Sequence, residues 1–245
     1  MADFSDRQAS FLAGETPVPK GAPSYLADHR ARLRARFEAG GHAPMPDYEL
    51  LELLLFRMIP RRDVKPVARA LIDRFGDLGG VLAAPPADLA TIDGVGAAVA
   101  LELKVTEAAA QRALRSRVMR RPVVSGWDAL LDYLRATLSR STTERFRILF
   151  LDTRNTLVAD EEQARGTIDH VPVYPREVVR RALELNAKAV ILVHNHPSGD
   201  PTPSQADIAV TQRIAAACEV LEITLHDHVI VGREATLSFR AHGLL

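Results

Sequence analysis

The sequence has a single cysteine, few aromatic residues and no long apolar run. Cys218 has no partner within the chain, which excludes an intrachain disulfide framework and fits a reducing compartment. Its Ala-rich helical surroundings predict a small core residue rather than a nucleophile. No stretch approaches the roughly 20 apolar residues of a membrane span, and residues 1–20 lack the basic start and apolar centre of a secretory signal. We therefore expect a cytoplasmic protein without membrane spans.

The chain also lacks an excess of charge of either sign, with 31 Lys and Arg against 31 Asp and Glu. No overall field therefore directs it towards nucleic acids or anionic membranes. Its 245 residues, of which 47% are hydrophobic, suffice for two modest domains with separate cores. No nucleotide-binding loop, Ser-His-Asp triad or internal repeat is visible, so none of these common classes is indicated.

The chain divides into a tail, a helical domain and an α/β domain. Residues 1–24 mix Pro, Gly, Thr and Ser without periodicity and are predicted to form a mobile tail. Helical patterns follow, including an apolar helix that Asp47 is expected to cap, and they predict a small all-helical domain over 25–121 that closes with a basic linker, 112–121. From Pro122 onward helices alternate with apolar strands, which predicts a mixed α/β domain over 122–245.

The helical domain contains a Gly-x-Gly pattern, Gly94 and Gly96, that opens onto a helix. The pattern resembles the helix-hairpin-helix of DNA-repair proteins, and backbone N–H groups at a helix N-terminus can bind a phosphate. Gly94, Gly96 and the following Lys104 are therefore candidate contacts for weak, non-specific DNA binding. A tight turn between two helices explains the same glycines without any ligand, so both interpretations stay open.

The pattern that best indicates chemistry follows the apolar run 189–193, which predicts a buried strand. His194 and His196 are two residues apart and therefore project to the same side at the end of this strand. A turn rich in Pro and Gly then brings Ser204 and Asp207 to the start of a helix. Two imidazoles and a carboxylate suit a catalytic zinc ion, which commonly takes three protein ligands and leaves the fourth position for water.

Two alternatives compete with this metal site. Ser-x-x-acid is also a helix-capping pattern, in which Ser204 and Asp207 satisfy backbone donors and bind no metal. A second His-x-His, His226 and His228, lies inside a later strand. No stiff loop and no helix-borne carboxylate follow it, so we expect this pair to pack beside the first site or to support it rather than to bind metal.

The first His-x-His segment resembles the metal signature of the JAB/MPN (JAMM) metalloproteases, in which His-x-His-Pro is followed by Ser and Asp. The signature positions are occupied by His194, His196, Pro197, Ser204 and Asp207. Three further segments resemble the bacterial RadC (UPF0758) branch: ERFRILFLD at 144–152, VYPREVV at 173–179 and DHVIVG at 227–232. The resemblance covers roughly residues 25–245. It implies a mixed α/β JAB/MPN fold, of the cytidine-deaminase-like type, behind a helical domain.

The resemblance also implies a zinc-dependent peptidase that cleaves an amide or isopeptide bond in a peptide substrate. His194, His196 and Asp207 would hold the Zn²⁺ ion. Ser204 would hydrogen-bond the attacking water or the developing oxyanion. The alternative function is a DNA-binding accessory protein in repair or recombination, with a structural or inactive metal domain. The sequence indicates neither the identity of the substrate nor the oligomeric state.

Such a peptidase needs a carboxylate to carry protons from the water to the leaving amine. In the resembled family this residue is a Glu near the end of the first helix or the start of the first strand, a position that Glu144 matches. Glu161 and Glu162 are alternatives, because they are predicted to lie on the adjacent strand of a hairpin. On composition alone Glu177 and Glu184 are candidates as well, and all five would otherwise be ordinary surface acids.

Overall fold

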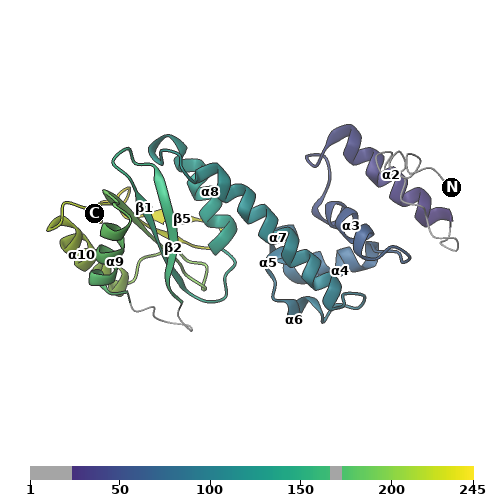
Figure 1. Cartoon of the computed structure of the whole chain (residues 1–245). Helices are drawn as coiled ribbons and strands as arrows, with labels where there is room; N and C mark the ends of the chain where they lie inside the picture. The colour runs from purple at the N-terminus through teal and green to yellow at the C-terminus, as the bar shows by residue number, and fades with distance from the viewer. Residues whose placement is uncertain (1–23, 166–172) are drawn as a thin grey trace, which may run out of the picture. The chain divides into compact units, whose positions relative to one another are not determined.

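The computed structural model describes residues 24–165 and 173–245 (Figure 1). The predicted tail lies outside these residues except for Ser24. The chain forms two compact units, of which the first ends at Val105 and the second begins at Thr106. This division falls inside helix α7 (Ala97–Val118), whereas the sequence placed the boundary at Pro122. The basic segment expected to be a linker is therefore helical as far as Val118, where its arginines extend an Ala-rich helix.

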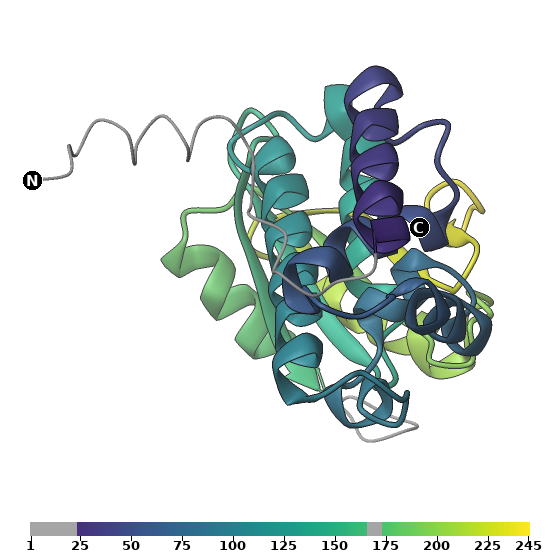
Figure 2. The same ribbon diagram turned by 90° about the vertical axis from the view of Figure 1, so that its right-hand side faces the viewer.

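The described part of the first unit contains helices and turns (Figures 1 and 2). Leu51, Leu55 and Leu71 are among the residues that form its core, and none of the three is exposed to solvent. Gly76 follows α4 with φ of 92°, a conformation that glycine adopts without strain and that ends the helix. The helices are α2 (Ser24–Gly40), α3 (Asp47–Met58), α4 (Lys65–Phe75), α5 (Leu78–Ala83), α6 (Pro86–Leu89) and the first part of α7.

One prediction in this unit is wrong. Asp47 was expected to cap α3, but Pro46 holds the N-cap position and makes no side-chain cap hydrogen bond. The Asp47 carboxylate instead accepts a hydrogen bond from the backbone N–H of Leu78, at 2.8 Å. Asp47 therefore satisfies a free N–H at the start of a different helix, α5, that is distant in the sequence.

A five-stranded mixed sheet, in the order β2-β1-β3-β4-β5, forms the centre of the second unit. β1 pairs antiparallel with both β2 and β3, while β3 and β4 run parallel. A parallel pair needs a crossover connection, which α10 (Gln205–Glu219) supplies. The strands are β1 (Arg145–Leu151), β2 (Leu157–Arg165), β3 (Ala189–Asn195), β4 (Thr224–Val231) and β5 (Thr236–Ser238).

Helices cover both faces of this sheet, α9 (Pro175–Glu184) and α10 on one and α8 (Trp127–Leu138) on the other (Figure 1). Successive residues of a strand point to opposite faces, so β3 contributes Val190 and Leu192 to the α9–α10 core and Ile191 and Val193 to the α8 core. Burial on both faces explains why β3 is a continuous apolar run. His194 continues the row of Val190 and Leu192, which carries it to the α9–α10 face.

A buried polar cluster joins the β1–β2 hairpin to α8. Arg147 binds Asp160 with two hydrogen bonds, Nε to Oδ1 at 2.9 Å and Nη2 to Oδ2 at 2.7 Å. The Tyr133 hydroxyl donates to Asp160 Oδ2 at 2.6 Å. Burial, together with the negative charge of Asp160, raises the pKa of Tyr133 to about 12.

The predicted fold class, a helical N-terminal region followed by a mixed α/β domain, is confirmed. The hairpin predicted to carry Glu161 and Glu162 is formed by β1 and β2. Cys218 is buried on α10, and this burial raises the pKa of its thiol to about 11. Within 24–165 and 173–245, no helix combines the length and apolar character needed to cross a bilayer.

Candidate metal centre

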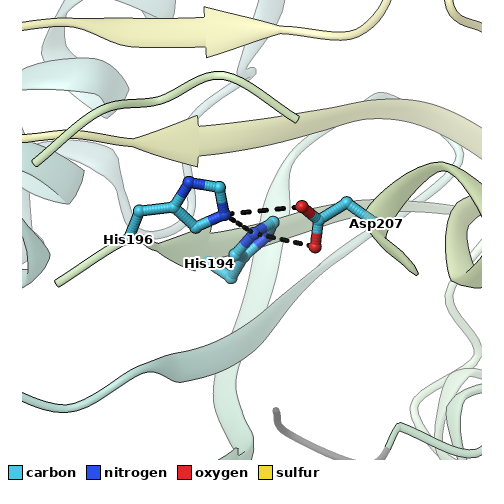
Figure 3. A group of neighbouring side chains, drawn as sticks. All are labelled: His194, His196 and Asp207. Atoms are coloured by element: carbon cyan, nitrogen blue, oxygen red, sulfur yellow. Dashed lines mark hydrogen bonds and ion pairs between the residues drawn. The ribbon is translucent and has the colours of Figure 1, made fainter. Parts of the chain in front are cut away.

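His194, His196 and Asp207 converge where β3 ends and α10 begins (Figure 3). The Nε2 atoms of the two histidines are 2.9 Å apart. Asp207 Oδ1 lies 3.2 Å from the Nε2 atom of His194, and its Oδ2 lies 3.4 Å from that of His196. Ligands of a tetrahedral zinc ion, each ~2.0–2.2 Å from the metal, are roughly 3.3 Å apart. The separations therefore fit a single ion bound by all three side chains.

The ring of His196 is oriented by the loop that follows it. Its Nδ1 atom lies 2.8 Å from the backbone carbonyl of Asp200. A carbonyl only accepts, so Nδ1 carries the proton and Nε2 presents a lone pair towards His194 and Asp207. Thr202 in turn donates from its backbone N–H and its hydroxyl to Asp200 Oδ1, at 2.9 and 2.7 Å. A nitrogen lone pair aimed in this way, beside a carboxylate, is the donor chemistry that zinc prefers.

The same loop packs closely against the end of β4. His196 donates its backbone N–H to Val231 at 3.1 Å, and Gly199 accepts from the backbone N–H of Arg233 at 2.9 Å. A Cβ atom at Gly232 would overlap the Gly199 carbonyl oxygen and would lie 2.8 Å from Pro201 Cδ. Glycine at position 232 therefore permits the close approach of the loop that carries His196.

Ser204 and Asp207 form a capping box as well as part of the centre. The Ser204 hydroxyl accepts from the Asp207 backbone N–H at 3.1 Å and donates to Asp207 Oδ2 at 2.6 Å. The backbone N–H of Ser204 donates to the same oxygen at 2.7 Å. The capping interpretation is confirmed and is compatible with ligation, because it orients the carboxylate. The hydroxyl has one proton, so a contact with water or an oxyanion requires it to turn; that role of Ser204 stays a prediction.

The electrostatics of the centre keep Asp207 ionised. Burial disfavours its carboxylate, but the neighbouring imidazoles of His194 and His196 and the hydrogen bond from Ser204 outweigh burial and hold the pKa of Asp207 well below the usual range. The adjacent Asp207 carboxylate raises the pKa of His196, against the effect of burial, and the charge of Glu144 adds to this rise. The centre therefore combines one anionic donor with two imidazoles.

Phe146 and His228 contact His194, and Thr211 contacts His228; of these three residues the sequence analysis had connected only His228 with the site. The ring of Phe146 stacks on His194 with centroids 5.8 Å apart and planes 9° from parallel. His228 Nε2 lies 2.8 Å from His194 Nδ1, and Thr211 Oγ1 lies 2.6 Å from His228 Nδ1. His228 was expected only to pack beside or support the site; it is fully buried, which lowers its pKa well below the ordinary value. The position of Thr211, four residues after Asp207 and hence on the same helix face, was a usable signal.

His226 does not share the environment of His228, because β4 contains a bulge. Leu225 pairs with Val190 and Asp227 with Ile191, which leaves His226 as the extra residue. Its Nε2 atom lies 2.6 Å from Asn155 Oδ1, and its side chain lines a cavity of about 410 Å³ together with residues of the α8 face. Among the described residues, metal-binding spacing is found at His194, His196 and Asp207 and not at this second pair.

Glu144 lies immediately before β1, whose Phe146 pairs with His194. The side chain of Asn195, only 1% exposed, holds the backbone on both sides of Glu144. Its Oδ1 accepts from the N–H of Arg145 at 3.0 Å, and its Nδ2 donates to the carbonyl of Thr143 at 3.1 Å. This clamp fixes the segment of Glu144 to the strand that carries both histidines. The sequence contained no signal for the clamp, because the two segments are distant in the chain.

The alternative proton carriers lie farther from the histidines. Glu161 and Glu162 pair with Ile148 and Arg147 of β1, on the side of β1 opposite to β3. The carboxylate of Glu161 binds Arg181 of α9, with distances of 2.6 and 2.8 Å. The register of the sheet therefore favours Glu144 over both alternatives.

The candidate DNA contacts of the first unit have structural partners. Lys104 donates from Nζ to the carbonyls of Leu82 and Ala84, at 2.7 and 3.3 Å, and so binds the end of α5. Gly94 has φ of 87°, and a Cβ atom there would lie 3.0 Å from Val67 Cγ2. A Cβ atom added at Gly96, just before α7, would meet nothing within 4 Å. Gly94 therefore has a structural role in the turn and Lys104 has one at the end of α5, and DNA binding stays a prediction.

Comparison with known proteins gives consistent matches over this fold. A family model described as the RadC-like JAB domain matches residues 124–244. A UPF0758 protein of Ruegeria pomeroyi is 65% identical over 223 residues, which make up 91% of this chain and 100% of that protein. A UPF0758 protein of Rhodobacter capsulatus is 66% identical over 213 residues, or 87% of this chain and 100% of that protein.

Proposed function

Because the chain belongs to the RadC (UPF0758) family and carries its JAB domain, we propose that the second unit is a zinc-dependent metallopeptidase. JAB domains are often metal-dependent hydrolases, and the bond cleaved here would be an amide or isopeptide bond in a peptide. The observation that carries the proposal is the convergence of His194, His196 and Asp207, whose donor atoms lie within 4.8 Å of one another.

His194, His196 and Asp207 would hold the ion and leave one tetrahedral position open. When bound, zinc lowers the pKa of a coordinated water towards ~7 and polarises a substrate carbonyl. The capping box contributes by holding Asp207, and the Asp200 carbonyl contributes by holding the ring of His196. The chain thus supplies a set of donors that is oriented before the ion arrives.

Glu144 would accept the proton of the attacking water and deliver it to the leaving amine. The two hydrogen bonds of Asn195 support this role, because they hold the backbone on either side of Glu144 beside the histidine strand. Ser204 would donate to the developing oxyanion once its hydroxyl turns away from Asp207. These assignments rest on the positions of the two side chains and on their chemistry.

Metal analysis of the purified protein tests the site. We expect about one zinc ion per chain, and loss of most of it in His194→Ala and in Asp207→Ala, because three ligands become two. His226→Ala is the matched control, since it removes an imidazole of the same unit that lies outside the centre, and it should keep its zinc. Unchanged zinc in both ligand variants would contradict the proposal.

Cleavage of a peptide and isopeptide library tests the activity. Glu144→Gln keeps the shape of the side chain but cannot accept a proton, so it should retain zinc and lose ~10²–10⁴-fold in turnover. Glu161→Gln serves as the control and should remain active. Full activity of Glu144→Gln would transfer the role to another carboxylate. Loss of zinc in that variant would identify Glu144 as a ligand instead.

A further inference from the structure

His194 begins a buried chain of hydrogen bonds that ends on a helix carbonyl. Its Nδ1 atom lies 2.8 Å from His228 Nε2, and His228 Nδ1 lies 2.6 Å from Thr211 Oγ1. Thr211 Oγ1 lies 2.5 Å from the backbone carbonyl of Asp207. The exposed fraction is 0% for both histidines and 1% for Thr211. Because these groups are closed off from solvent, their hydrogen-bonding capacity must be satisfied within the chain.

The Asp207 carbonyl, at the end of this series of hydrogen bonds, determines where each proton lies. A carbonyl only accepts, so the Thr211 hydroxyl donates its one proton to Asp207. The oxygen of Thr211 must then accept from the Nδ1–H of His228. A neutral imidazole carries one ring proton, so Nε2 of His228 is an acceptor and Nδ1 of His194 is the donor. His194 is left with a bare Nε2 atom.

That Nε2 atom faces the other two ligands. It lies 2.9 Å from His196 Nε2, which also presents a lone pair because the Asp200 carbonyl takes the proton of its Nδ1. Asp207 adds a carboxylate oxygen at 3.2 Å. Two nitrogen lone pairs and an anionic oxygen repel one another at these distances, and a cation between them converts the repulsion into attraction.

We propose that His228 and Thr211 are positioning residues that lock His194 in the Nδ1–H tautomer and aim its Nε2 lone pair at the metal. The inference rests on the proposed zinc site. The series of hydrogen bonds starts at the ligand His194 and ends on the backbone carbonyl of the ligand Asp207. It therefore also connects the strand that carries His194 to the helix that carries Asp207. Partners of this kind, bound to the second nitrogen of a ligand histidine, typically change metal affinity 10–100-fold.

Thr211→Val and Thr211→Ser form a matched pair for the test. Valine keeps the branched shape but removes the hydroxyl, so His228 loses the acceptor for its Nδ1–H, whereas serine retains that acceptor. Titration of the full chain with zinc alone, in competition with a zinc-binding dye, should give a Kd ~10–100-fold higher for Thr211→Val and nearly unchanged for Thr211→Ser. Equal affinity of the two variants would overturn the positioning role.

The ¹⁵N chemical shifts of the imidazoles provide a readout that packing alone does not move. In the metal-free unaltered chain, His194 and His228 should both show a protonated Nδ1 and a bare Nε2, and Thr211→Val should show mixed tautomers. A protonated Nε2 on His194 in the unaltered chain would overturn the inference, whether or not the valine variant folds. Failure of the unaltered chain to bind zinc would instead overturn the proposed function, and the positioning role with it.

Discussion

Replacing Asn195 by alanine should loosen the segment of Glu144 while leaving the metal ligands intact. Asn195 lies between His194 and His196 in β3, and alternation along the strand directs its side chain to the other face of the sheet. There it accepts from the N–H of Arg145 and donates to the carbonyl of Thr143. Asn195→Ala removes both hydrogen bonds and adds no bulk or charge.

The magnitude follows from the groups that lose a partner. An unsatisfied buried donor or acceptor costs ~1–3 kcal/mol. Asn195 is buried, but Thr143 and Arg145 are half-buried, so water partly replaces the two lost hydrogen bonds. The lower part of that range therefore applies to each of the two groups that lose a partner. We therefore expect Asn195→Ala to reduce the free energy of unfolding of the second unit by about 2–3 kcal/mol.

The fluorescence of Trp127, the single tryptophan of the chain, reports on the unfolding of the second unit in urea. Gln212→Ala removes an exposed amide from α10 and should change stability by less than ~0.5 kcal/mol. Asn195→Ala should also keep its zinc and lose turnover, as Glu144→Gln does, because the proton carrier is no longer held in place. A variant as stable as Gln212→Ala, with full turnover, would refute the reasoning.

Two further predictions concern the loop and the polar cluster. Gly232→Ala should weaken zinc binding and lower the free energy of unfolding by ~1–3 kcal/mol, because the added Cβ overlaps Gly199. Gly126→Ala is the control, since a Cβ there meets nothing within 4 Å, and it should change neither the zinc titration nor the urea midpoint. The folded pKa of Tyr133, about 12, exceeds its unfolded value of 10.0, so its stabilisation is complete below pH 10 and is lost as pH rises towards 12. That loss of stability is on the order of 2–3 kcal/mol between pH 10 and pH 12. It should be absent from Tyr133→Phe, which has no hydroxyl to ionise, when the urea midpoints of the two proteins are measured over this pH range. An equal decrease of the midpoint with pH in both proteins would contradict the prediction.

The sequence by itself determined the local features of the second unit. Alternation along one strand was enough to place His194 and His196 on one side, and the turn to α10 was enough to bring Asp207 to them. The capping pattern at Ser204 was also readable, because all its partners lie within a single helical turn. The alternation of a strand and the periodicity of a helix each involve only a few neighbouring residues, so both can be recognised in the sequence without knowledge of the rest of the fold.

Tertiary structure decided the features that depend on strand register and on contacts between distant segments. The bulge in β4 separates His226 from His228, although their spacing equals that of the metal histidines. His228 reaches His194 from 34 residues away, and Asn195 reaches Thr143 from 52. Asp47 likewise binds the start of α5 rather than its own helix. The physical reason is that these contacts depend on which strands and helices pack together. That packing is determined by the burial of the whole core and not by residues that are neighbours in the sequence.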